Sequence, residues 1–262
     1  MVDILRETIP VRYGNVDRSD RLTLDCIFSL FQEAAISHAA DLGVGRDAMS
    51  NKGQGWILSR LSLFVHRRPL YEETIQVSTW PRKWEKLLAL RDYEIRDAQN
   101  AVVVRGRGGW LVVDIEKRRP LRAQSVMEPL PPNEGTDALP SGPAGLGAAE
   151  NLVKKMERTA LYSDIDYYGH TNNARYIQWI QDVTDMDILT NANQIRLDIN
   201  YLSEVLPGQT VELFVAPLVN NGAPSESNAA DYPQSAVAGF AYEGRRPGAG
   251  EPVFRAELRT GA

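Results

Sequence analysis

The feature that most constrains the fold of this chain is an internal repeat. The motif Tyr13-Gly14-Asn15-Val16-Asp17 returns 149 residues later as Tyr162-Ser163-Asp164-Ile165-Asp166. A second pair of segments, Arg60-Leu61-Ser62-Leu63 and Arg196-Leu197-Asp198-Ile199, lies 136 residues apart. An insertion of 13 residues between the two motifs of the first copy reconciles these offsets. The chain therefore contains a duplicated unit, and its fold must be built twice.

Each copy starts with an amphipathic helix and continues into strands. Apolar residues recur at helical spacing on one face of each helix: Leu24, Ile27, Phe28, Phe31 and Ala35 in the first copy, and Tyr176, Trp179, Ile180 and Val183 in the second. Strands of the first copy are predicted over about 56–66, 73–80, 87–97 and 101–114, with a hairpin turn near Asp97 to Asn100. One helix against an antiparallel sheet is an α+β arrangement. We therefore expect a tandem of two helix-plus-sheet units whose sheets join edge to edge into one continuous sheet.

The two copies are separated by residues 123–150, which contain five prolines and four glycines. This density of residues that break helices and strands predicts a linker. The expected organisation is an N-terminal unit at 1–122, the linker, and a C-terminal unit at 151–262. A second polar stretch, Asn220 to Gln234, is predicted to be a long surface loop.

Composition narrows the function classes. Apolar residues make up 43% and charged residues 24%, as in ordinary globular proteins, and the net charge of −5 disfavours a nucleic-acid partner. The first ten residues lack a signal-peptide core, and no apolar run could span a bilayer. The only cysteine, Cys26, excludes an intramolecular disulfide and a multi-thiolate metal site, and is predicted to pack within the first helix. We expect a cytoplasmic protein with no metal, cofactor or membrane partner.

A polar turn directly before the second helix is the first candidate for chemistry. Asp166 and His170 lie four residues apart, and Gly169 permits a tight backbone between them. An aspartate that accepts a hydrogen bond from an imidazole fixes its tautomer, and free amides at a helix start can stabilise an oxyanion. The simpler interpretation is that Asp166 caps the turn and that Asn172 or Asn173 caps the helix.

The repeat favours the chemical interpretation. A further carboxylate, Glu204, follows the segment 195–203 and enters a Leu-Pro-Gly turn, where a solvated glutamate is the simpler reading. The first copy keeps the aspartate as Asp17 but changes the other polar positions: Arg21 stands for His170, Leu24 for Asn173 and Arg68 for Glu204. One copy is therefore predicted to be catalytic and the other to be scaffold.

The turn and the helix after it carry a composite motif: Asp164-Ile165-Asp166, His170, Asn172-Asn173 and Tyr176-Ile177-Gln178-Trp179. This motif resembles the signature of the acyl-acyl-carrier-protein thioesterases, the plant-type fatty acyl chain terminators and their bacterial relatives. The resemblance extends to Thr79-Trp80-Pro81 in the first copy and to Tyr201–Val205 in the second. It implies a tandem hotdog fold and hydrolysis of the thioester between a fatty acyl chain and the phosphopantetheine arm of the carrier.

The resemblance also matches Asp166, His170 and Glu204 to the catalytic positions of the family. The chain departs from the family pattern at two places. Tyr168 stands where the family commonly has asparagine, and Val205 stands where some plant members have cysteine, so a cysteine nucleophile there is impossible.

A mechanism without a cofactor follows as a hypothesis. Glu204 acts as general base toward water, or as nucleophile, at the thioester carbonyl, and His170, oriented by Asp166, holds the water or donates to the departing thiol. Helix-start amides near Asn172 and Asn173 stabilise the oxyanion. Tyr168 either replaces the missing asparagine as a hydrogen-bond donor or faces outward.

The remaining assignments concern substrate and partner. The first copy is expected to hold the acyl chain, with Phe28, Phe31 and Trp56 as candidate lining residues, although ordinary core residues would look the same. Basic clusters are candidate docking points for an acidic carrier protein, or else solvated loops at strand ends: Arg67, Arg68, Arg118 and Arg119. The protein is expected to be a monomer or a homodimer.

Three other functions compete with carrier-linked hydrolysis as explanations of these motifs. A hydratase or dehydratase is disfavoured, because its signature places aspartate and histidine five apart with an Asn-Pro between them, whereas Asp166 and His170 lie four apart without proline. An acyl-CoA thioesterase shares the chemistry and differs only in the carrier. A catalytically silent acyl-binding protein stays open because of Tyr168.

Overall fold

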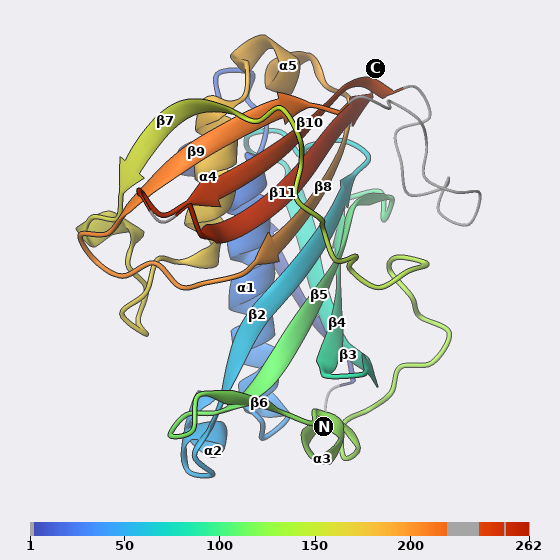
Figure 1. Cartoon of the computed structure of the whole chain (residues 1–262). Coiled ribbons are helices and arrows are strands. Elements are labelled where there is room, and N and C mark those ends of the chain that lie inside the picture. Colours follow the sequence, from blue (N-terminus) through green and yellow to red (C-terminus); the bar gives the residue numbers. More distant parts are fainter. Residues whose placement is uncertain (1–2, 219–235, 249, 262) are drawn as a thin grey trace. The chain divides into compact units, whose positions relative to one another are not determined.

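The structure, a computed structural model, describes residues 3–218, 236–248 and 250–261 (Figure 1). The chain divides into two compact units, Met1–Pro143 and Ala144–Ala262. The predicted surface loop Asn220 to Gln234 lies outside the described residues. Among the helices of the described part, none is both long and apolar enough to span a bilayer.

The first unit is one antiparallel sheet with a long helix. Its elements are β1 (Leu5–Pro10), η1 (Tyr13–Asn15), α1 (Leu24–Asp41), α2 (Arg46–Ser50), β2 (Gln54–Val65), β3 (Thr74–Glu85), β4 (Leu88–Arg96), β5 (Val102–Asp114), β6 (Arg119–Leu121) and α3 (Gln124–Met127). The strands are ordered β1-β3-β4-β5-β2, and β6 pairs with β5. The four predicted strands and the predicted hairpin are confirmed, since Asp97 and Asn100 close the β4–β5 turn through backbone hydrogen bonds.

Helix α1 buries the apolar face that its spacing predicted. Phe28 and Phe31 are fully buried, and the Phe31 ring stacks on Tyr93 of β4 with centroids 4.7 Å apart. The close approach needs a glycine on β5, because a Cβ at Gly106 would lie 2.8 Å from the Phe31 ring. The core of the first unit therefore lies between α1 and the sheet, with the size of the β5 side chains matched to the helix.

Residues 123–143, predicted as the first part of a linker, pack into the first unit. Met127 and Leu130 belong to a buried apolar cluster. Asp92 of β4 is fully buried, receives two hydrogen bonds from Arg107 of β5 at 2.5 and 2.6 Å, and accepts the amide of Ala138 at 2.8 Å. The prolines and glycines prevent regular structure here, but buried charged side chains of the sheet bind the irregular backbone. The unit boundary therefore falls at Pro143 rather than at residue 122.

The second unit repeats this plan with a shorter helix. Its elements are β7 (Val153–Thr159), η2 (Tyr162–Asp164), α4 (Asn173–Val183), α5 (Met186–Asn191), β8 (Gln194–Tyr201), β9 (Thr210–Pro217), β10 (Ala236–Arg245) and β11 (Pro252–Gly261). The strand order is β8-β11-β10-β9-β7. Helix α4 buries Tyr176, Ile177, Trp179 and Ile180. A Cβ at Gly244 of β10 would lie 2.2 Å from the Phe254 ring, so this position accepts only glycine.

The prediction of an α+β fold from two helix-plus-antiparallel-sheet units is confirmed. In each unit the sheet lies against one long helix, which is the hotdog arrangement. The two polar turns singled out in the sequence occupy the same place in each unit, directly before α1 and α4.

Candidate active site

The turn before α4 is built around the carboxylate of Asp166. Its Oδ1 accepts the amide of Tyr168 at 2.8 Å and that of His170 at 3.4 Å, and its own amide donates to the His170 carbonyl at 2.8 Å. Gly169 takes a positive φ of 82° at the tightest point. The short Asp-to-His spacing therefore closes a small loop that presents the His170 side chain.

His170 meets Glu204, which lies in the loop after β8. Its Nε2 is 3.1 Å from Oε2 of Glu204. The two loops are joined by the residues next to these side chains, since the Thr171 amide donates to the Val205 carbonyl at 2.8 Å. The side chains of His170 and Glu204 are 41% and 53% exposed, so water can reach both. An imidazole bonded to a solvated carboxylate can activate water or donate a proton to a leaving group.

The contacts of Asp166 differ from the geometry expected for it. Its described hydrogen bonds run to main-chain amides of the turn, as given above, and none of them runs to the imidazole ring. In the described structure Asp166 therefore positions His170 through the backbone, whereas Glu204 contacts the ring.

The helix start is largely occupied by local hydrogen bonds. Asn172 is the N-cap of α4, and its side chain accepts the amide of Ala174 at 2.9 Å. The Asn172 amide donates to the Asp164 carbonyl at 2.8 Å. The capping interpretation of Asn172 is thus confirmed, and its amide is not available for an oxyanion. Within the described residues no acceptor is assigned to the amide of Asn173, which is the remaining candidate donor.

Comparisons with known proteins agree with this arrangement of turn, helix and carboxylate. The family description "Acyl-ACP thioesterase N-terminal domain" matches residues 3–128, and "Acyl-ACP thioesterase C-terminal domain" matches residues 149–236. The chain belongs to the acyl-ACP thioesterase family. The second match begins next to β7 and contains Asp166, His170 and Glu204.

Individual relatives are distant but similar in fold. A palmitoyl-acyl carrier protein thioesterase of Cuphea hookeriana is 23% identical over 216 residues, which are 77% of this chain and 52% of the relative. An oleoyl-acyl carrier protein thioesterase of Coriandrum sativum is 23% identical over 82% of this chain and 63% of its own. The chain thus spans little more than half the length of these plant relatives.

Solved structures of two family members superpose over nearly the whole chain. An acyl-ACP thioesterase from Bacteroides thetaiotaomicron gives a TM-score of 0.80 at 23% identity and covers 98% of this chain and 97% of its own. A 12:0-ACP thioesterase from Umbellularia californica gives 0.75 at 19% identity, with 98% and 93% covered. At these identities the likeness shows the tandem hotdog fold.

Tyr168, the departure from the family pattern, is 60% exposed. Its ring packs edge to face on Tyr167, which is 72% exposed, with centroids 5.7 Å apart. Of the two roles predicted for Tyr168, the outward-facing one agrees with this position.

Two residues that the sequence reasoning did not assign to the site lie in it. The pKa of the Tyr176 hydroxyl is raised, mainly by burial. A backbone hydrogen bond at Val205 and the charge of Arg246 lower this pKa, whereas the nearby carboxylates of Asp166 and Glu204 raise it, so the hydroxyl interacts with both loops of the site. The sequence places Tyr176 on the core face of α4, and its position in the family motif is the signal that could have assigned it to the site. Arg246, at the start of the β10–β11 hairpin, contacts the Glu204 loop, and its sequence context carries no such signal.

The proposed acyl-chain residues do not lie together. Phe28 and Phe31 are buried on the inner face of α1, and the Phe31 ring lies against Gly106. Trp56 lies further along β2, pairs with Val112, and packs on the apolar cluster of Met127 and Leu130. Its indole donates to the Val44 carbonyl at 2.9 Å. Phe28 and Phe31 therefore belong to one apolar region of the first unit and Trp56 to another.

The four arginines proposed for docking also divide. Arg68 is buried, with 3% of its side chain exposed and its Nη1 2.5 Å from Oδ2 of Asp17. The prediction that Arg68 contacts the carrier protein is therefore wrong. Arg67 forms ion pairs with Glu73 at 2.6 Å and Asp97 at 2.8 Å, which compensate its charge. Arg118 and Arg119, at the entry to β6, are exposed. These last two remain as candidates.

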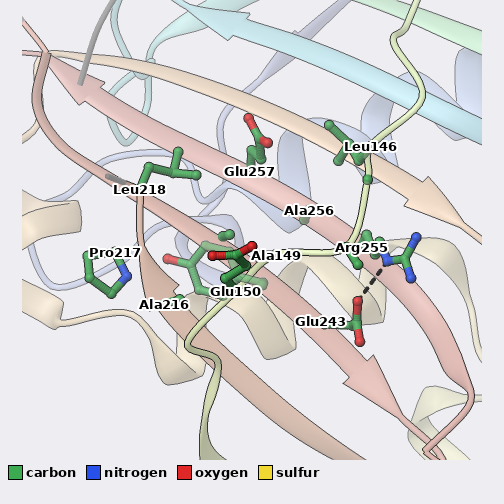
Figure 2. A pocket seen from close by; sticks show the side chains of 14 residues that line it. Leu146, Ala149, Glu150, Ala216, Pro217, Leu218, Glu243, Arg255, Ala256 and Glu257 are labelled. Atoms are coloured by element: carbon green, nitrogen blue, oxygen red, sulfur yellow. Dashed lines mark hydrogen bonds and ion pairs between the residues drawn. The ribbon is translucent and has the colours of Figure 1, made fainter. Parts of the chain in front are cut away.

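A pocket in the second unit lies away from the catalytic candidates. Figure 2 shows it between the segment Leu146–Glu150 and strands β9, β10 and β11. The volume of the pocket is about 330 Å³. Glu243 in its wall accepts a hydrogen bond from Arg255 at 2.7 Å. The pocket lining includes none of the predicted site residues.

Proposed function

We propose that this chain hydrolyses the thioester of fatty acyl-acyl carrier protein and releases the free fatty acid. The observation that carries the proposal is the His170–Glu204 pair, 3.1 Å apart and open to water, in a unit that matches the C-terminal domain of the acyl-ACP thioesterases. The Cuphea and Coriandrum relatives, which are named as thioesterases of acyl carrier protein, support the same reaction. The cytoplasmic location and the monomeric or dimeric state stay predictions.

The chemistry uses the two exposed side chains and one amide. Glu204 takes a proton from water, which attacks the thioester carbonyl, and His170 holds that water or returns a proton to the departing thiolate. The amide of Asn173 donates to the oxyanion that forms on the carbonyl. Asp166 holds the His170 main chain in the turn. Water and the thioester are thus converted into a fatty acid and the free thiol of the carrier.

The test is release of thiol from an acyl-acyl carrier protein by purified protein. The wild type should turn over, and Glu204→Ala and His170→Ala should each lower the rate by about 100-fold or more. Arg21→Ala, at the position equivalent to His170 in the first unit, is the matched control and should stay near wild type. Near-wild-type hydrolysis by both catalytic variants would show that this site is not the active site.

The proposal also specifies that the acyl chain is carried by a protein and not by CoA. A comparison of one acyl chain on carrier protein and on CoA should favour the protein, and the opposite preference would make the chain an acyl-CoA thioesterase. Arg118→Glu with Arg119→Glu should slow turnover of the carrier-bound substrate and weaken its salt dependence, since these exposed charges are the proposed contact with an acidic partner. Unchanged rates at every salt concentration would exclude this docking surface.

A further inference from the structure

The main chain of Glu204 is anchored by Arg246. Its Nη2 donates to the Glu204 carbonyl at 2.8 Å and to Ser203 Oγ at 2.9 Å, and its Nη1 donates to Gln209 Oε1 at 3.0 Å. Gln209 Oε1 also accepts the amide of Leu206 at 2.9 Å. One guanidinium therefore joins both ends of the loop that carries Glu204 to the β10–β11 hairpin.

The first unit has an equivalent hydrogen-bonded cluster, or clamp, but its arginine stands at a different position. The arginine is on the loop after β2 in the first unit and on the hairpin in the second. Arg67 donates to Glu73 and Asp97, and Glu73 accepts the amide of Leu70 at 2.9 Å, as Gln209 accepts that of Leu206. Backbone hydrogen bonds set the equivalence, because the amides of Arg67 and Ser203 donate to Val103 and Val253, and those of Asp97 and Arg246 donate to Ala101 and Glu251. The equivalent pairs are thus Arg67 with Ser203, Glu73 with Gln209, and Asp97 with Arg246.

The exchange changes what the clamp holds. In the first unit two carboxylates neutralise the arginine, and the clamp is a local ion-pair cluster. In the second unit all hydrogen bonds described for the Arg246 guanidinium go to uncharged oxygens, and one of these is the carbonyl of Glu204 itself. In the second unit the cation lies on the hairpin, and its shortest hydrogen bond, at 2.8 Å, goes to the residue that carries the proposed base.

From this arrangement we propose that Arg246 is a positioning residue for the Glu204 carboxylate; the inference rests on the proposed function. The Val205 carbonyl receives the Thr171 amide from the His170 turn, while the Glu204 carbonyl receives Arg246 from the β10–β11 hairpin. Because the Glu204 side chain is 53% exposed, its surroundings only half enclose it, and the position of its backbone largely sets where the carboxylate lies. Arg246 keeps that backbone where Oε2 meets His170.

Loss of this anchor should affect the chemical step more than substrate binding. A displacement of about 1 Å in a catalytic group can cost up to about 100-fold in rate. Arg246 acts through Glu204, so its loss lowers the fraction of molecules with the His170–Glu204 pair formed. The expected signature is a lower kcat with little change in KM.

The experiment compares clamp variants of the two units in the full chain. Arg246→Met should lower kcat on acyl-acyl carrier protein by about 10- to 100-fold with KM within about twofold. Arg246→Lys should recover part of this loss, because an ammonium retains the charge but cannot span the same acceptors. Asp97→Ala, at the position of Arg246 in the first unit, should leave kcat within about twofold although it also removes turn hydrogen bonds to Gln99 and Ala101. Thermal unfolding of each variant sets an assay temperature at which all are folded.

A double variant separates positioning from a general structural defect. Arg246→Met should have little further effect in a Glu204→Gln background, because the group that it positions is already lost. The role of Arg246 is overturned if Arg246→Met keeps wild-type kcat, if Asp97→Ala costs as much, or if the losses with Glu204→Gln multiply. If instead the wild type releases no thiol, or His170→Ala and Glu204→Gln stay active, the proposed function has failed.

Discussion

The turn before α1 and the turn before α4 share a backbone but carry different side chains. Asp17 accepts the amides of Ser19 and Arg21 at 2.8 and 3.4 Å, the same two distances that Asp166 has to Tyr168 and His170. The link to the neighbouring loop is also the same, from Leu22 to Pro69 and from Thr171 to Val205, at 2.8 Å in both. The two turns therefore share one backbone scaffold, and two side chains distinguish the proposed catalytic turn from its counterpart in the first unit.

The charged side chains of the two turns form different ion pairs. In the first unit the free oxygen of the aspartate pairs with Arg68, which is 3% exposed, and the site is a closed ion pair. Burial would raise the pKa of Asp17, but hydrogen bonds from Ser19 and Arg68 outweigh burial and lower it. In the second unit Glu204 replaces that arginine, stays half exposed and turns to His170. A closed pair stabilises a fold, whereas an open pair can meet a substrate.

The strongest test of this comparison converts the second site into the first. His170→Arg with Glu204→Arg should abolish hydrolysis, with a loss of about 100-fold or more, because both reacting groups are gone. The fold should persist, since Asp166 could then pair with the new arginine as Asp17 pairs with Arg68. Thiol release and circular dichroism check the two halves. Retained activity would show that His170 and Glu204 are not the reacting groups. An unfolded variant would show that the two turns are not interchangeable scaffolds.

The reverse side of the comparison concerns stability. Arg68→Met leaves the Asp17 carboxylate without its buried partner and should cost about 3 kcal/mol, near the lower end for a broken buried ion pair because Asp17 is 22% exposed. Arg67→Met removes the pairs to Glu73 and Asp97, but the Arg67 side chain is 42% exposed, so solvent screening should make its cost smaller than that of Arg68→Met. Denaturant unfolding measures both. Equal costs would contradict the assignment of Arg68 to a buried pair.

The pH dependence of stability sharpens the same point. Because the pKa of folded Asp17 lies below its ordinary value of 3.8, this carboxylate contributes stability above about pH 4, and the contribution is lost as the pH falls through the lowered value. The difference in unfolding free energy between the wild type and Arg68→Met should therefore shrink as the pH is lowered from 6 to about 3. A difference that stayed constant would mean that Asp17 is not the partner that Arg68 stabilises.

The smallest effect on activity and stability is expected at Tyr168, which stands where the family commonly has asparagine. Tyr168 is 60% exposed, so Tyr168→Asn should change kcat and stability by no more than about twofold and 0.5 kcal/mol. Steady-state kinetics beside the Tyr167→Asn control would measure it. A gain of tenfold or more would show that the asparagine common in the family does chemical work that this chain lacks.

Much of this site was accessible from the sequence, and the rest failed for identifiable reasons. Asp166, His170 and Glu204 stood out because the first copy changes two of the three. The burial of Arg68 was missed because its partner, Asp17, lies 51 residues away along the chain. Arg246 was missed because an arginine followed by proline and glycine in a hairpin has no local sequence pattern that distinguishes it.

The sequence by itself determined the duplication, the two amphipathic helices, the hairpin strands and the identity of the polar residues in each turn. These features depend on spacing along the chain, which is visible without a fold. Only the tertiary structure decided that Asp166 binds the main chain of its turn, that Glu204 meets His170, and that Arg246 holds the Glu204 loop. The physical reason is that these hydrogen bonds join segments far apart in sequence, and their geometry exists only once the sheets have formed.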